Sequence, residues 1–247
     1  NDEDVIITAL SSSWGALSLN GPKSRDVLGA CTDRALDNAA FRWLSAQEII
    51  VAGHKVWAFR MSYAGELGWE LHMPFDAMID VYTALWAAGE AHEIVNYGSF
   101  AMNVMRMEKG FKGAGELTNE VTLAEADVLR FARADKDYLG RDKTLNTDLP
   151  WVCAYLEIEP DGEIDGHGGE AVLLDGQVVG STASVAYGPT VGKILAFAYI
   201  KPGAAVTGTA LEVVIHGKLR TARVLGEPAY DPQSLRPRMD AVMAPMQ

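Results

Sequence analysis

Cysteine and basic residues are both scarce in this chain of 247 residues. Its two cysteines, Cys31 and Cys153, form no CxxC pair, which excludes a disulfide-stapled fold and a cysteine-rich zinc site and is typical of a reducing compartment. The 21 Lys and Arg residues against 33 Asp and Glu residues leave a net charge of −12. Because nucleic acids and anionic membranes attract basic surfaces, this charge argues against broad binding to either.

Long apolar runs and metal-binding histidine spacings are also absent. No window of about 18 apolar residues predicts a membrane-spanning helix. The five histidines are scattered without HxxxH or HExxH spacing, so the sequence predicts no metal site. The amino end, Asn1-Asp2-Glu3-Asp4, is acidic and lacks the basic and apolar regions of a secretory signal. We therefore expect a cytoplasmic location, or the mitochondrial matrix for a eukaryotic chain.

What is present is typical of a globular protein, with 49% apolar and 22% charged residues. The length allows one large domain or two small ones. The chain does not begin with Met, and Asn1 leads almost at once into the strand-like run Val5-Ile6-Ile7. Since a domain seldom begins on a core strand, we expect a piece of a longer polypeptide that lacks the N-terminal part of its first domain.

Hydrophobic periodicity predicts a mixed α+β unit in the first part of the chain. A turn at Asn20-Gly21-Pro22 should start a short helix at Pro22. Alternation and turn residues predict strands at 14–19, 48–51, 55–61 and 67–73. Apolar steps of three and four predict helices at 74–89 and 99–109, with a shorter one after Gly140 and long loops over 110–136.

The second part of the chain reads as all-β. Six short β-type runs are separated by Gly-rich turns, at 151–158, 171–174, 178–185, 194–200, 211–215 and 219–225. Their spacing predicts a small barrel or a sandwich. We therefore divide the chain into an α+β domain at 1–148 and a β-barrel-like domain at 149–247.

The most informative stretch runs from Arg60 to Leu71. It predicts a strand, a tight Gly-Glu-Leu-Gly turn and a returning strand, with Tyr63 and Glu70 flanking the turn. A Tyr ring can stack on a flat heterocycle, and a carboxylate can accept two parallel hydrogen bonds from an amino-pyrimidine edge. The alternative is a plain hairpin in which Tyr63 is a core residue and Glu66 and Glu70 are solvated.

A second stretch, at 96–110, combines an apolar stripe with basic residues at its end. Arg106, Lys109 and Lys112 are clustered closely enough to attract an anionic ligand tail. The alternative is that Arg106 and Lys109 only complement the helix dipole.

The run from Tyr63 to Glu70 resembles the Tyr-Thr-Gly-Glu-x-Gly-x-Glu signature of the glycine-cleavage T-protein (aminomethyltransferase) family. It resembles more closely the folate-binding C-terminal region of dimethylglycine and sarcosine dehydrogenases. Three other stretches also resemble this region of the dehydrogenases: 17–25, 101–110, and 178–182 together with 192–199. The matches follow the same order along the chain and extend over nearly its whole length.

The resemblance implies an aminomethyltransferase-like fold that binds tetrahydrofolate, with Tyr63 and Glu70 holding the pterin. Glu66, Trp69 and Arg106 complete the candidate cofactor-binding residues, although Arg106 matches a helix position whose role we interpret as structural. The chain departs from the family at 101–103, where Ala-Met-Asn replaces Ala-Arg-Asp. The family's catalytic Asp lies before the matching part, so no catalytic residue is assigned.

The implied reaction transfers one carbon from an amine-derived donor to tetrahydrofolate. No GxGxxG follows an opening strand, so FAD is expected only if an upstream domain or a partner subunit carries it. Two alternatives stay open: a T-protein or folate-dependent demethylase, and a non-catalytic folate-binding module. The expected partners are folate, the carbon donor and a FAD-containing dehydrogenase domain or subunit.

Overall fold

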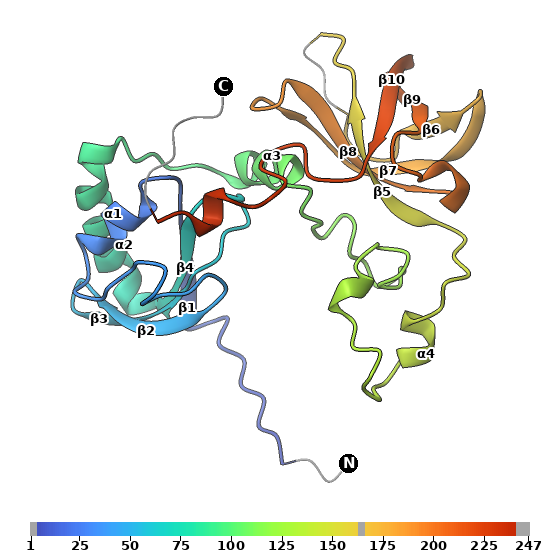
Figure 1. Ribbon diagram of the computed structural model, residues 1–247. Coiled ribbons are helices and arrows are strands. Elements are labelled where there is room, and N and C mark those ends of the chain that lie inside the picture. Colours follow the sequence, from blue (N-terminus) through green and yellow to red (C-terminus); the bar gives the residue numbers. More distant parts are fainter. Residues whose placement is uncertain (1–3, 163–165, 241–247) are drawn as a thin grey trace. The chain divides into compact units, whose positions relative to one another are not determined.

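The computed structural model describes residues 4–162 and 166–240, which fall into two compact units (Figure 1). Unit 1 comprises the described residues up to Tyr97 and those from Gln233 onward, and unit 2 runs from Gly98 to Pro232. The predicted combination of an α+β part with a β-barrel is confirmed. The domain boundary that we expect after residue 148 stays a prediction. The two units group residues by their contacts in space and not by position along the sequence, so they do not test it.

Unit 1 is a four-stranded antiparallel sheet with two helices. Its strands have the order β1-β4-β3-β2. The elements are β1 (Trp14–Asn20), α1 (Ser24–Gly29), β2 (Ala46–Val51), β3 (His54–Phe59), β4 (Gly68–Pro74), α2 (Phe75–Gly89), and the 3-10 turns Glu90–His92 and Arg236–Arg238.

The core of unit 1 lies on one face of this sheet, against α1 and α2. On β4 the side chains of Trp69, Leu71 and Met73 are fully buried, because residues at every second position share one face. Val81 and Leu85 of α2 are buried against them. On the other face of β4, Glu70 and His72 are only partly buried, so the predicted alternation is confirmed.

Two predictions near the start of unit 1 are wrong. Val5, Ile6 and Ile7 form no strand, and their side chains are 67%, 89% and 92% exposed. Apolar β-branched residues become a strand only when a neighbouring strand pairs with them. The first helix begins at Ser24 and not at Pro22, because Ser24 N closes a turn onto the carbonyl of Gly21 at 3.0 Å.

Unit 2 contains a closed six-stranded antiparallel barrel, with the order β10-β5-β8-β7-β6-β9 (Figure 1). The barrel resolves the open choice between barrel and sandwich. The elements are α3 (Ser99–Glu108), α4 (Arg141–Thr144), β5 (Val152–Ile158), β6 (Ala171–Leu174), β7 (Gln177–Gly188), β8 (Lys193–Ile200), β9 (Ala210–Ile215), β10 (Lys218–Leu225), and the 3-10 turns Leu129–Phe131 and Pro202–Ala204.

The barrel interior holds alternate apolar residues of all six strands. Outside it, Met107 of α3 packs with Cys153, Leu195 and Phe197 in a second apolar cluster. None of the helices formed by the described residues combines the length and apolar character needed to cross a bilayer.

Candidate functional site

The predicted pterin site lies in unit 1, on the connection from β3 to β4. The two strands pair with Trp57 opposite His72 and Phe59 opposite Glu70. The connection spans residues 60–67 and is wider than the tight turn that we predicted. The pairing of β3 with β4 ends at Phe59, and the next residue, Arg60, bonds on the β2 side, where its backbone N–H donates to the Ser45 carbonyl at 2.9 Å and its carbonyl accepts from Leu44 N at 3.0 Å.

The end of this connection is held by the turn that follows β1. The Leu67 carbonyl accepts hydrogen bonds from Gly21 N at 2.8 Å and from Ser24 Oγ at 3.0 Å. At Gly68 a Cβ atom would lie 2.2 Å from Asn20 Oδ1 and 2.8 Å from the Leu19 carbonyl oxygen. The backbone can approach β1 this closely only because residue 68 is glycine.

Glu70 points to the sheet face opposite the core, and its side chain is 34% exposed. Its neighbours in the register are Ser18 of β1 and Phe59 of β3. His72 Nε2 lies 3.4 Å from Glu70 Oε2. On β1, Asn20 Nδ2 donates to Ser18 Oγ at 2.7 Å. The carboxylate is therefore presented on a partly open face lined by polar and aromatic side chains.

Tyr63 and Glu66 lie within the connection itself. The Tyr63 side chain is 36% exposed and lies outside the core cluster, and Glu66 is partly buried. Gly65 between them has φ +77°, a conformation that favours glycine. The alternative in which Tyr63 is a core residue is therefore not supported.

Trp69 occupies a different environment from its neighbour Glu70. Its side chain is fully buried on the core face, and its ring meets the Phe41 ring edge-on at 6.3 Å. The guanidinium groups of Arg25 and Arg60 lie 5.9 and 5.8 Å from the ring centroid. Burial, followed by the positive charge of Arg25, lowers the pKa of Arg60. Trp69 and Glu70 point to opposite faces of β4, so Trp69 supports the strand from within the core.

Arg106 belongs to unit 2, whereas the other four predicted site residues belong to unit 1. Its guanidinium donates to Glu116 Oε2 at 2.7 Å and to Ser184 Oγ at 3.0 Å. Further bonds of 3.0 Å reach the Phe111 carbonyl and Asn103 Oδ1. All three guanidinium nitrogens are thus engaged inside unit 2, which favours the structural role over ligand contact.

The basic cluster predicted around Arg106 is also engaged within unit 2. Lys109 Nζ is fully buried and donates to the Asp231 carbonyl at 2.6 Å and to Asp231 Oδ2 at 3.2 Å. Lys112 Nζ lies 3.5 Å from Asp127 Oδ2. Lys112 lines a cavity of about 550 Å³ at the barrel, together with Tyr155 and other residues. Because Lys109 is buried and paired, it does not present its charge to a ligand tail.

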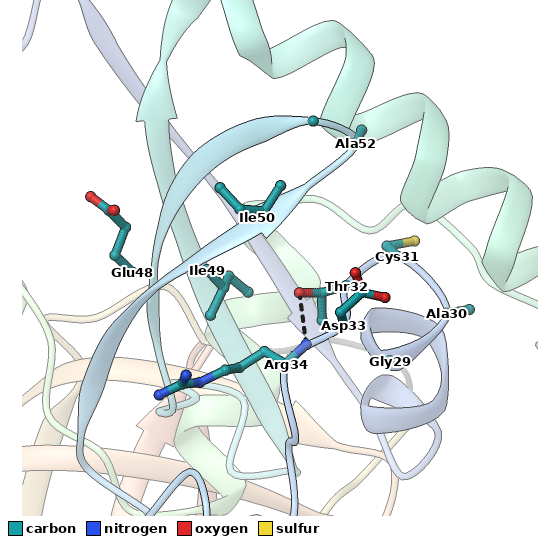
Figure 2. Close-up of a pocket in the computed structure, with 11 residues that line it drawn as sticks. Gly29, Ala30, Cys31, Thr32, Asp33, Arg34, Glu48, Ile49, Ile50 and Ala52 are labelled. Atoms are coloured by element: carbon teal, nitrogen blue, oxygen red, sulfur yellow. Dashed lines mark hydrogen bonds between the residues drawn. The ribbon is translucent and has the colours of Figure 1, made fainter.

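A separate groove of about 690 Å³ in unit 1 is lined by residues 29–34, 48–50, 52 and 53 (Figure 2). Cys31 in this groove donates its thiol to the Ala84 carbonyl at 3.4 Å, and burial raises the pKa of the thiol. Arg34 Nε donates to Gln47 Oε1 at 2.9 Å. None of the predicted folate-binding residues lines this groove, and its thiol is not activated as a nucleophile.

Sequence reasoning missed the surroundings of Glu70. His72 was predicted to share its strand face, but the contact between the two side chains was not predicted. Ser18 and Phe59 were missed because their position beside Glu70 depends on strand register. Register depends on pairing between distant segments, and one sequence does not reveal it.

Comparison with known proteins agrees with this architecture. Residues 1–136 match the family model described as the GCVT N-terminal domain, and residues 152–231 match that of the glycine cleavage T-protein C-terminal barrel domain. Human mitochondrial dimethylglycine dehydrogenase is 32% identical over 244 residues, covering 96% of this chain and 28% of that protein. Mouse mitochondrial sarcosine dehydrogenase is 38% identical over 197 residues, covering 77% of this chain and 21% of that protein.

A solved structure gives the same fold. The crystal structure of glycine cleavage system aminomethyltransferase T from Bartonella henselae matches with a TM-score of 0.71 and 20% identity, over 89% of this chain and 60% of that one. This chain spans less than a third of the length of the two dehydrogenases. With both family models matched in order along the sequence, the chain belongs to the glycine cleavage T-protein family.

Proposed function

We propose that this chain is the tetrahydrofolate-binding, one-carbon-transfer module of an enzyme related to dimethylglycine and sarcosine dehydrogenases. The observation that carries the proposal is Glu70, a partly exposed carboxylate that ends the family signature and stands on the open face of the sheet. An ionised carboxylate there matches the paired N–H donors of a pterin edge.

The surroundings of Glu70 fit a flat heterocycle. The Tyr63 ring is partly exposed on the adjoining connection, and Trp57 is 43% exposed on the outer face of β3. Aromatic rings with one face open to solvent offer stacking surface, and the carboxylate offers directional hydrogen bonds. Tyr63 and Glu70 would hold the pterin, while Glu66 would border it and Trp69 would stiffen the strand from the core.

When bound, tetrahydrofolate would supply the nitrogen atoms that accept the one-carbon unit. The contribution of this chain is to bind the pterin, fix its orientation and keep water from the reacting nitrogens. Glu70 accepts hydrogen bonds in this scheme and moves no proton. The carboxylate that assists proton transfer stays unassigned.

The oxidation of an amine donor belongs to our proposal for the longer protein. The two relatives described above are named as dehydrogenases, and this chain spans only 28% and 21% of their lengths. We propose that a FAD-containing domain or subunit generates the one-carbon donor and that this chain receives it. The compartment stays a prediction.

Calorimetric titration of the chain with tetrahydrofolate under anaerobic conditions tests the proposal. We expect saturable binding that Glu70→Gln weakens about tenfold or more, because a charge-assisted hydrogen bond is lost. Glu48→Gln is the matched control, since Glu48 is an exposed carboxylate of the same sheet that pairs with Lys55 at 3.1 Å. Absence of binding by the wild-type chain, or equal losses in the two variants, would refute the site.

A non-catalytic folate-binding module is the second candidate, and the observation that favours it is Met102 at the place of the family's Arg. This candidate predicts that the chain binds folate but transfers no carbon, even when the one-carbon donor used by the full-length enzyme is supplied. A T-protein or folate-dependent demethylase remains the other alternative, and the coding sequence upstream of Asn1 would distinguish it.

A further inference from the structure

Glu70 and His72 are close neighbours on the open face of the sheet in unit 1. Alternate residues of a strand point to the same side, and two such residues stand about 7 Å apart along the strand. The two side chains nevertheless bring Nε2 of His72 to 3.4 Å from Oε2 of Glu70. Both side chains must therefore lean toward each other.

The direction of this contact follows from the chemistry of the two groups. An ionised carboxylate accepts hydrogen bonds and cannot donate them. Nε2 of His72 must then carry the hydrogen, in either the Nε2–H tautomer or the imidazolium. His72 takes up one lone-pair position of Oε2, so both carboxylate oxygens keep positions that can accept from a ligand, and the hydrogen bond restricts the rotation of the carboxylate before a ligand arrives.

The His72 ring is itself held in place. The ring of Phe59 on β3 meets it edge-on, with centroids 4.9 Å apart and an angle of 67° between planes. On β1 the register partner of His72 is Ala16, whose small side chain leaves space beside the ring. The His72 side chain is 39% exposed, so the ring is fixed by Phe59 and is not enclosed in the core.

We infer that His72 is a positioning residue that orients the carboxylate of Glu70 for ligand recognition. The inference rests on the proposed function and deepens it. A glutamate that is free to rotate loses conformational entropy when a ligand fixes it, whereas a glutamate already held by a neighbour loses less. His72 thus acts through Glu70 and needs no contact with the folate.

A double-mutant cycle on the 247-residue chain tests this inference, with tetrahydrofolate binding as the readout. We expect His72→Phe to weaken binding by about 3- to 10-fold, the usual worth of one hydrogen bond. The double variant Glu70→Gln/His72→Phe should bind no more weakly than Glu70→Gln alone, because His72 acts only through the carboxylate. His72→Gln keeps an N–H donor and should recover most of the affinity.

His54→Phe is the matched control. His54 is another partly exposed histidine of the sheet, and its Nε2 lies 2.9 Å from Asp80 Oδ2. Its replacement removes a comparable histidine–carboxylate pair without touching Glu70, so folate affinity should not change. Thermal unfolding of the ligand-free variants reports whether His72→Phe acts through stability.

The outcomes separate the inference from the proposed function. If the wild-type chain does not bind tetrahydrofolate, the proposed function fails and this inference falls with it. Suppose that the wild type binds and that Glu70→Gln weakens binding. The inference alone is then overturned if His72→Phe leaves the affinity unchanged, or if the double variant loses affinity by the product of the two single losses. A loss in His72→Phe that His72→Gln does not recover also overturns it.

Discussion

Replacing Arg106 by methionine should destabilise unit 2 far more than the loss of an ordinary surface arginine. The side chains of Arg106 and Glu116 are 5% and 0% exposed, and their charged atoms are 2.7 Å apart. Removing one partner of a buried ion pair costs about 3–5 kcal/mol, because the other charge stays buried without compensation. Glu116 Oε2 would keep its bond from Gly113 N at 2.6 Å, which places Arg106→Met near the lower end of that range.

The comparison variant is Arg223→Met on β10. Arg223 pairs with Glu157 of β5, and their side chains are 58% and 21% exposed. Water screens this pair, so its loss should cost about 0–1 kcal/mol. Urea titrations give the free energy of unfolding of each variant, and hydrogen exchange of the barrel peptides locates the loss in unit 2.

A third variant completes the test. Glu116→Gln combined with Arg106→Met removes the buried charge as well as its partner, so the double variant should be more stable than Arg106→Met alone. Equal stability of Arg106→Met and Arg223→Met would refute the structural role. Loss of tetrahydrofolate binding in a fully stable Arg106→Met variant would instead identify Arg106 as a ligand-binding residue.

Three further predictions concern other parts of the chain. Gly68→Ala should lower the free energy of unfolding of unit 1 by about 1–3 kcal/mol, because the new Cβ atom would clash with Asn20. The control is Gly98→Ala, whose Cβ atom would have no atom within 4 Å and should cause no such loss, and thermal unfolding compares the two variants. Met239→Ala removes a side chain buried in the unit 1 core and should cost about 2–5 kcal/mol in urea titrations. Burial acts to raise the pKa of Glu170, but hydrogen bonds from a threonine hydroxyl and from backbone N–H groups lower it overall, below its ordinary 4.5. The stability lost in Glu170→Gln should therefore be largest above pH 4.5 and disappear as the pH falls through the lowered pKa. Melting curves of the wild type and the variant from pH 7 to 3 measure this loss, and a difference between the two that does not change with pH would contradict the prediction.

The secondary structure was largely predictable because it depends on local periodicity. Alternation along β4 correctly placed Trp69 and Leu71 on one face and Glu70 on the other. Gly-rich turns marked the six barrel strands in the same way. These patterns depend on residues that are near each other in sequence, so one sequence is enough to reveal them.

The site was less predictable because its geometry depends on distant contacts. The end of the connection before β4 is held by hydrogen bonds that the turn after β1 donates to the Leu67 carbonyl, from residues more than 40 positions away. The environment of Arg106 depends on Glu116 in a loop and Ser184 on β7, and no local pattern announces either contact. The sequence could therefore indicate which residue types form a site, but not which of them are already paired.

The chain leaves unit 1 after Tyr97 and returns to it at Gln233, so unit 2 is inserted within unit 1 along the sequence. The guanidinium of Arg25 donates to the carbonyls of Asp240 and Met239, both at 2.8 Å, and the first of these bonds joins residues 215 positions apart. On the ribosome, these bonds cannot form until the whole of unit 2 has been synthesised. Unit 1 therefore receives its last contacts only after unit 2 has been made, although its sheet precedes unit 2 along the chain. This reverses the usual order, in which the domain made earlier finishes folding first.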